Sequence, residues 1–279
     1  MFENIEELLS LFGDEEVRKI ILSSYFLSQE KNKELSDTVF EKLFFLKTIY
    51  SEISIKINRK SNSPSNYNHS EKTIYLNGMF DELTFFHELT HLFSRQQFNY
   101  AIPVEFDKFK NEFLLSKNNR SLLFSFIELC KLKKQKLFNS SQIDFVHNNY
   151  IKNSAEIINC STDIVTEIIV IRHLEDIIDA LMDGKSHDLG LYYEIDSNHI
   201  VQKATPRAGH GCEYYAVPGA EFEEIIANYQ AINLIAPQNE LFNSLKSILG
   251  EDFIVFLDNR CQQMNGSKIT IENNNNILK

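Results

Sequence analysis

The chain has 279 residues, of which 43% are hydrophobic and 24% are charged, a composition that can bury a sizeable core and excludes a largely disordered protein. Its 39 acidic and 28 basic residues give a formal net charge of -11, which argues against nucleic acid or an anionic membrane as a non-specific partner, because both are themselves negative. With only 9 glycines and 5 prolines and no repeat of fixed period, collagen-like, solenoid and low-complexity architectures are excluded.

The cysteines and the amino-terminal segment indicate the compartment. Cys130, Cys160, Cys212 and Cys261 are far apart and form no C-x-x-C pair, so we expect reduced thiols and no cysteine-based zinc knuckle. The first residues are acidic, whereas a signal peptide needs a basic start and an unbroken apolar stretch. No window approaches 18 apolar residues, so no membrane span is expected. We expect a soluble protein, and export into a host cell cytosol would use a route that needs no signal peptide.

The amino-terminal third predicts helices followed by a small sheet. Apolar residues at helical spacing favour helices over 3–28 and 35–50. Alternation of apolar and polar residues predicts strands at 53–57 and 73–77, with a polar loop over 60–70 between them. We expect the strand at 73–77 to lie at the edge of the sheet, where it could pair with an extended peptide.

The remainder of the chain is predicted to be mainly helical. Asp81 can cap a helix over 81–98, and long helical patterns follow over 104–135 and 153–183. The last of these carries a cluster that we expect on a solvated acidic face, with a second metal site as the alternative: His173, Glu175, Asp176, Asp179 and Asp183.

A loop rich in glycine and proline precedes the carboxyl-terminal helices. This loop covers 203–219. A helix resumes at Ala220, another is expected over 239–259, and the tail over 265–279 is expected to be flexible.

One motif in this chain carries recognisable chemistry. The sequence HELTH at 87–91 matches the pattern H-E-x-x-H inside the predicted helix. Residues four apart on a helix lie on the same face, so both imidazoles can bind one Zn2+, and Glu88 can take a proton from the attacking water. Ser94 and Gln97 stand where the metzincin extension requires Gly and His, which excludes that branch. The alternative is an ordinary amphipathic helix whose histidines face solvent.

A catalytic zinc site needs a third protein ligand, with the fourth position left to water. Glu221 is the first candidate. Glu112 lies 21 positions after His91, close to the spacing of thermolysin-like peptidases, and His210 is a further candidate.

Glu221 has a physical argument of its own. It follows the Pro218-Gly219 turn at the start of a predicted helix, which gives its carboxylate a fixed direction. Glu224 and Asn228 fall on the same face and are expected to orient the ligand histidines by hydrogen bonds. An acidic first turn that complements the helix dipole is the alternative interpretation.

Two segments of the chain resemble a known family. FFHELTHLF at 85–93, followed far downstream by Tyr214 and the A-E-F segment at 220–222, is similar to the gluzincin-type zinc metalloproteases of bacterial toxins and effectors, the family of the anthrax lethal factor catalytic domain. The chain departs from that family in the much longer separation of the two segments. It also departs at Ile225, where the family has a second Glu.

The resemblance implies a function and a set of residue roles. His87, His91 and Glu221 would bind zinc, Glu88 would be the base, and Tyr214 would assist. It also implies a secreted protease that cuts a host protein in a reducing cytosol.

The carbonyl oxygen of a peptide under attack gains negative charge and needs a hydrogen-bond donor. Tyr214 is the first candidate for that role. Tyr215, His210 and Arg207 are the alternatives in the same part of the chain.

These observations lead to one interpretation and two alternatives. We expect an α+β, zincin-like fold, predominantly helical with a small twisted sheet, as a single domain over 1–264 with a helical insertion at about 104–200. The expected function is a zinc-dependent endopeptidase that acts on a protein substrate. A thermolysin-like peptidase that uses Glu112 as third ligand is one alternative, and a catalytically silent binding protein is the other.

Overall fold

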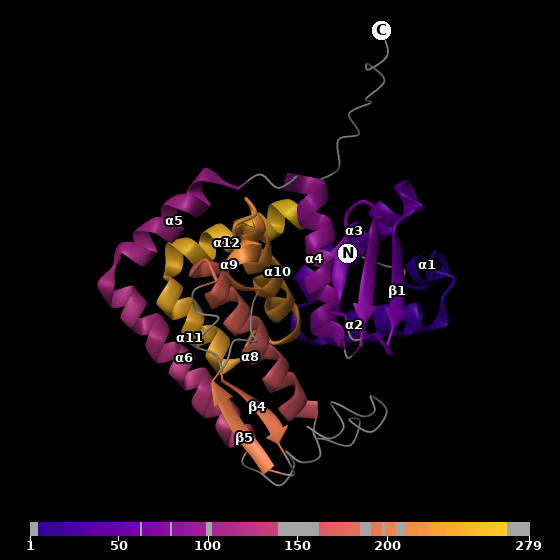
Figure 1. The fold of residues 1–279 in the computed structure, drawn as a ribbon. Coiled ribbons are helices and arrows are strands. Elements are labelled where there is room, and N and C mark those ends of the chain that lie inside the picture. The colour runs from indigo at the N-terminus through magenta and orange to yellow at the C-terminus, as the bar shows by residue number, and fades with distance from the viewer. Residues whose placement is uncertain are drawn as a thin grey trace.

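The computed structural model describes residues 5–61, 63–78, 80–98, 102–138, 162–184, 191–196, 199–204 and 210–266. The amino-terminal elements, indigo to magenta in Figure 1, are α1 (Ile5–Ser10), α2 (Glu15–Lys31), α3 (Lys33–Ile49), β1 (Ser54–Asn58), β2 (Asn66–Asn68), β3 (Thr73–Asn77) and α4 (Glu82–Phe98).

The described elements after α4 are helices and one hairpin. They are α5 (Val104–Leu115), α6 (Lys117–Phe138), α8 (Thr162–Leu181), β4 (Leu191–Asp196), β5 (His199–Ala204), α9 (Gly211–Tyr215), α10 (Ala220–Ile235), α11 (Glu240–Leu249) and α12 (Glu251–Gly266). The structure is therefore a predominantly helical α+β fold with a small sheet, as the sequence predicted.

The three-stranded sheet has the order β1-β3-β2. β1 pairs with β3 in parallel, whereas β2 pairs with β3 in antiparallel fashion, with Tyr67 opposite Ile74. The expectation that 73–77 forms the sheet edge is wrong, because both sides of β3 are paired and β2 is an edge strand. β2 lies inside the expected polar loop, and its half-buried Tyr67, which packs against the hydrophobic core, gives this polar segment an apolar anchor.

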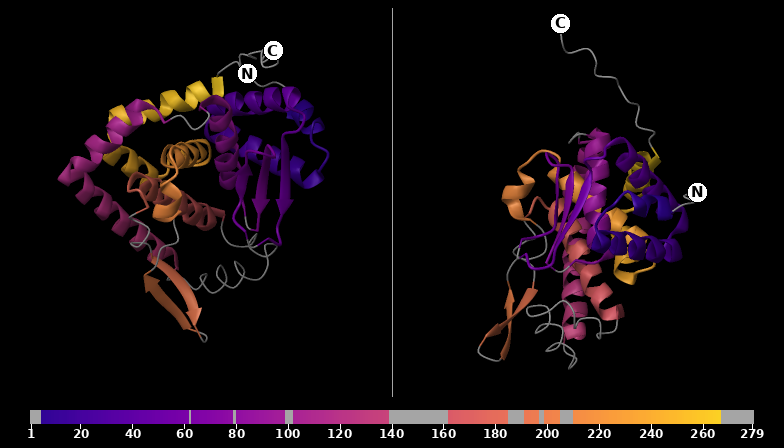
Figure 2. Two further views of the ribbon diagram at one scale, coloured as in Figure 1. Left: turned by 45° about the horizontal axis from the view of Figure 1, so that its top comes forward. Right: turned by 90° about the vertical axis from the view of Figure 1, so that its right-hand side faces the viewer.

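Helix α4 lies between the sheet and the carboxyl-terminal helices (Figures 1 and 2). Its N-terminus is capped as expected, because Oδ1 of Asp81 accepts a hydrogen bond from the backbone N–H of Thr84 at 2.9 Å. The helix packs against β2 and β3 on one side and against α10 on another. Burial on both sides explains its buried aromatic residues, among them Phe85, Phe86 and Phe93.

Helix α10 is the centre of the carboxyl-terminal part. Nearly all of its residues are buried, including polar ones, because α4, α8 and α12 pack around it. It begins after Gly219, whose φ of +89° lies in the left-handed region that suits glycine.

The segment 104–200 differs in detail from its prediction. The expected helix over 104–135 is two helices, because the chain turns at Ser116, which has extended backbone. α8 occupies the described part of the expected helix over 153–183, and residues 139–161 lie outside the described part of the chain. The antiparallel hairpin β4–β5 was not predicted, and it projects away from the helices (Figures 1 and 2). Among the described helices, none is both long and apolar enough to cross a membrane.

Gly78 directly follows β3, at the start of the connection to α4. Its φ is +58°, and a Cβ atom at this position would lie 2.9 Å from the backbone oxygen of Ser61. We therefore expect Gly78→Ala to lower the free energy of unfolding by about 1–3 kcal/mol, measured by denaturant titration.

Gly13 provides the matched control, because a Cβ atom there has nothing within 4 Å. Gly13→Ala should change the free energy of unfolding by no more than about 0.5 kcal/mol. Equal effects of the two substitutions would contradict the prediction.

Candidate metal centre

The two histidines of the motif lie one turn apart on α4 and face each other. Their Nε2 atoms are 3.1 Å apart, and their ring centroids are 4.6 Å apart with planes at 86°. His87 is 8% exposed. His87, Glu88 and His91 each offer one ligand atom, and these three atoms lie within 4.8 Å of one another. The helix thus brings the motif together in a largely buried place, as expected.

Glu224 of α10 is the carboxylate that faces both histidines. Its Oε2 lies 3.5 Å from Nε2 of His87, and its Oε1 lies 3.5 Å from Nε2 of His91. It is 2% exposed. The sequence assigned this residue only an orienting role, whereas the structure places it in direct reach of both imidazoles.

Glu221, the expected third ligand, lies elsewhere. Its Oε2 accepts a hydrogen bond from the buried Nζ of Lys110, which also contacts Asp183. The structure does not bring this carboxylate to the histidines and favours Glu224 in its place. The reason is the orientation of α10: the buried Phe222 packs against Phe98 and Phe106, and this directs Glu224 towards α4 and Glu221 towards α5.

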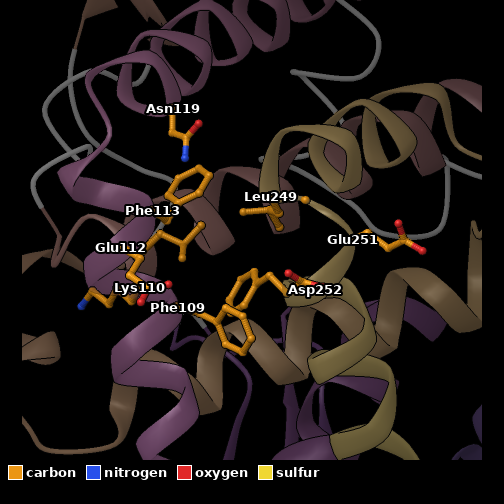
Figure 3. A pocket seen from close by; sticks show the side chains of 11 residues that line it. Phe109, Lys110, Glu112, Phe113, Asn119, Leu249, Glu251 and Asp252 are labelled. Carbon is orange, nitrogen blue, oxygen red and sulfur yellow. The ribbon is translucent and has the colours of Figure 1, made fainter.

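Glu112, the thermolysin-like alternative, is also remote from the histidines. Its side chain is 63% exposed, and its Oε1 lies 4.0 Å from Nζ of Lys108 on the same helix. It lines a cavity of about 250 Å³ between α5 and the corner of α11 and α12, together with Phe109 and Phe253 (Figure 3).

The two Nε2 atoms and the two carboxylate oxygens of Glu224 are spaced for a shared metal ion. Bonds of about 2.0–2.1 Å at tetrahedral angles separate ligand atoms by about 3.3–3.4 Å, close to the 3.1 Å between the two nitrogens and to the 3.5 Å from each nitrogen to a different oxygen of Glu224. Oε2 of Glu224 is buried and has no hydrogen-bond partner among the described residues, and a buried carboxylate oxygen without a partner is costly. A cation bound by His87, His91 and Glu224 would satisfy it.

The protonation states of the motif suit metal binding. Burial lowers the pKa of His87 and of His91 below its ordinary value, so both imidazoles are neutral at pH 7, the form that binds a metal. Burial, with the negative charge of Glu224, raises the pKa of Glu88 well above its ordinary value. The backbone N–H of Tyr67 on β2 donates to Glu88 and opposes this rise. A carboxylate with a raised pKa is suited to accept a proton.

Tyr214 and His210 lie on the outer side of Glu224. The hydroxyl of Tyr214 donates to Oε1 of Glu224 at 2.7 Å, and Nε2 of His210 lies 3.4 Å from the same oxygen. Their rings stack with centroids 4.1 Å apart. Burial and the charge of Glu224 raise the pKa of Tyr214, so the phenol keeps its proton and can donate it in a hydrogen bond.

The other two donors proposed from the sequence are not in this position. Tyr215 is buried, and its hydroxyl donates to Oδ1 of Asp176 at 3.0 Å. Arg207 lies outside the described residues.

Helix α8 contributes residues that the sequence did not assign to the site. The ring centroid of His173 lies 5.3 Å from that of His87. Asn228 joins the two elements, because its Nδ2 donates to Oδ2 of Asp176 and to the backbone oxygen of Glu224, both at 2.8 Å. Its Oδ1 is therefore free to accept from Nδ1 of His173, with which it is in contact.

The expectation of a solvated acidic face on α8 is wrong. Asp179 is fully buried, and Glu175 is 8% exposed. Apolar residues occur nearly all round this helix, among them Val170, Ile171 and Leu174. This distribution in the sequence could have predicted that the helix is buried, because a helix that is apolar on every side has no polar face to expose to solvent.

Comparison of the chain with protein-family models, with curated proteins and with solved structures finds no significant match. Function is therefore inferred from the geometry of the site. The resemblance to the lethal factor type of protease stays a prediction from two short segments.

Substitution of Glu224 and of Glu221 can test which of the two is the third metal ligand. Glu224→Gln should weaken zinc binding by more than about 100-fold, because loss of an outer partner alone costs about 10- to 100-fold. Glu221→Gln removes the same charge from the same helix and should leave zinc affinity unchanged. Zinc affinity is measured by competition with a chelator, and the opposite ranking of the two variants would contradict the assignment.

Proposed function

We propose that the chain is a zinc-dependent endopeptidase with a zincin-like fold that hydrolyses a peptide bond in a protein substrate. The observation that carries this proposal is the buried group of His87, His91 and Glu224, in which each imidazole faces one oxygen of the same carboxylate, with Glu88 adjacent. Two imidazoles and one carboxylate are a ligand set typical of catalytic zinc, which keeps a further position open.

A bound zinc ion would polarise the substrate carbonyl and lower the pKa of an attacking water molecule. Glu88 then has the role of general base, because its buried carboxylate can accept a proton from that water and pass it to the leaving amine. The hydroxyl of Tyr214 donates to the carbonyl oxygen as it becomes negative. His210, stacked on Tyr214, supports the position of that ring.

The arrangement of the sheet supports a peptide as the substrate. β2 is an edge strand that packs against α4, and an edge strand can bind an extended peptide through backbone hydrogen bonds. The backbone of Tyr67 on this strand also contacts the proposed base. A peptide that pairs with β2 would therefore lie next to Glu88. From the resemblance, we propose a host-cell protein as the substrate.

The role of Glu88 can be tested without knowing the substrate. Glu88→Ala should keep bound zinc, because three ligands remain, and should lose turnover by about 100- to 10,000-fold. Cell lysate is incubated with each protein, and new peptide amino termini are identified by mass spectrometry. New termini that appear equally with wild type and Glu88→Ala would contradict the proposal, as would wild-type protein that contains no zinc.

The role of Tyr214 needs a substrate found in that screen. Tyr214→Phe should lower kcat by about 10- to 1,000-fold with zinc affinity unchanged. Tyr75→Phe serves as control, because it removes a hydroxyl of β3 that donates to Glu71 and lies outside the proposed site. An unaltered kcat in Tyr214→Phe would remove this phenol from the mechanism.

A further inference from the structure

A buried ion pair lies on the side of His91 that faces away from His87. Nε of Arg95 donates to Oε2 of Glu223 at 2.8 Å. The same oxygen lies 4.0 Å from Nδ1 of His91. Arg95 is four residues after His91, so the two side chains project from the same face of α4, opposite the first turn of α10.

Both charges are removed from solvent. Glu223 is 3% exposed, and the side chain of Arg95 is 15% exposed. The guanidinium of Arg95 favours the charged form of the carboxylate to which it donates. The pair therefore places the carboxylate of Glu223 beside Nδ1 of His91.

A contribution to folding stability does not by itself explain why Arg95 and Glu223 form a buried ion pair. The cost of desolvating two buried charges largely offsets their attraction, so such pairs contribute little net stability. A geometric account is stronger, because Nε2 of His91 faces Glu224 while Nδ1 faces Glu223. The other imidazole lacks this arrangement, since Nδ1 of His87 has no hydrogen-bond partner among the described residues.

We propose that Glu223 is a positioning residue for the metal centre: it accepts a hydrogen bond from Nδ1–H of His91, and Arg95 holds its carboxylate in place for that bond. The observed 4.0 Å exceeds a hydrogen bond by about 1 Å, so the bond needs a small shift of the carboxylate. Its second oxygen, Oε1, is buried and has no hydrogen-bond partner among the described residues. The bond fixes the tautomer of His91 so that Nε2 carries the lone pair towards the metal. This role rests on the proposed zinc centre.

The experiment compares zinc affinity among four variants of the full chain. Glu223→Gln keeps the shape of the side chain and removes its charge, and Arg95→Gln removes the partner. Glu221→Gln is the matched control, because it removes a carboxylate of α10 that is also paired with a buried cation, Lys110 of α5. The fourth variant combines Arg95→Gln with Glu223→Gln. Zinc dissociation constants come from chelator competition, and the melting temperature of each metal-free protein is measured in parallel.

Glu223→Gln should bind zinc about 10- to 100-fold more weakly than wild type, with Glu221→Gln unchanged. Arg95→Gln should also weaken binding. The double variant should be within about twofold of Glu223→Gln, because the two residues act as one unit. Similar melting temperatures of the metal-free proteins would separate positioning from a general loss of fold.

Several results would overturn the inference. Wild-type affinity in Glu223→Gln would do so, as would an equal loss in Glu221→Gln, which would indicate a general effect of removing charge from α10. If Glu223→Gln does not fold, Arg95→Gln carries the test, and its wild-type affinity would reject the role. Absence of zinc binding by wild type would instead reject the proposed metal centre itself.

Discussion

The packing of α4 against α10 is the constraint on which the rest of the site depends. Each helix alone offers an incomplete set of ligands: α4 carries two imidazoles one turn apart, and α10 carries the carboxylate. Only their contact brings Oε1 and Oε2 of Glu224 to 3.5 Å from the two Nε2 atoms. The aromatic contacts of Phe222 with Phe98 and Phe106 fix the orientation of α10 and so select the acidic side chain that faces the histidines.

Burial at the contact between α4 and α10 determines the protonation of its ionisable side chains. Glu88, Glu223 and Glu224 are all at most 5% exposed, and three like charges so close in a poorly solvated place would repel one another strongly. Burial accordingly raises the pKa of Glu88 and of Glu223, while Arg95 pairs with Glu223 and His210 lies 3.4 Å from Oε1 of Glu224. Burial also lowers the pKa of both histidines, so their neutral nitrogens face the carboxylate of Glu224, a donor set that suits a divalent cation.

Some of this site could be predicted from the sequence and some could not. The H-E-x-x-H motif and the Asp81 cap follow from local patterns, because helical spacing and capping act within a few residues. The choice between Glu221 and Glu224 depends on the rotation of α10 about its axis, which tertiary packing decides. The edge strand β2 could not be predicted for a similar reason, since its polar residues form a strand only by pairing with β3.

The segment between the two halves of the site is part of the site rather than an appendage. His173 and Asp176 come from α8, and through Asn228 they are bonded to the backbone of Glu224 itself. The ring of His173 also packs on His87, so α8 contacts a proposed ligand from each of the other two helices. Helix α8 packs closely against α10, and such surrounding contacts help a metal centre to keep the geometry of its ligands. The long separation of the motif from α10 in the sequence therefore accommodates a third wall of the site, built by the intervening residues.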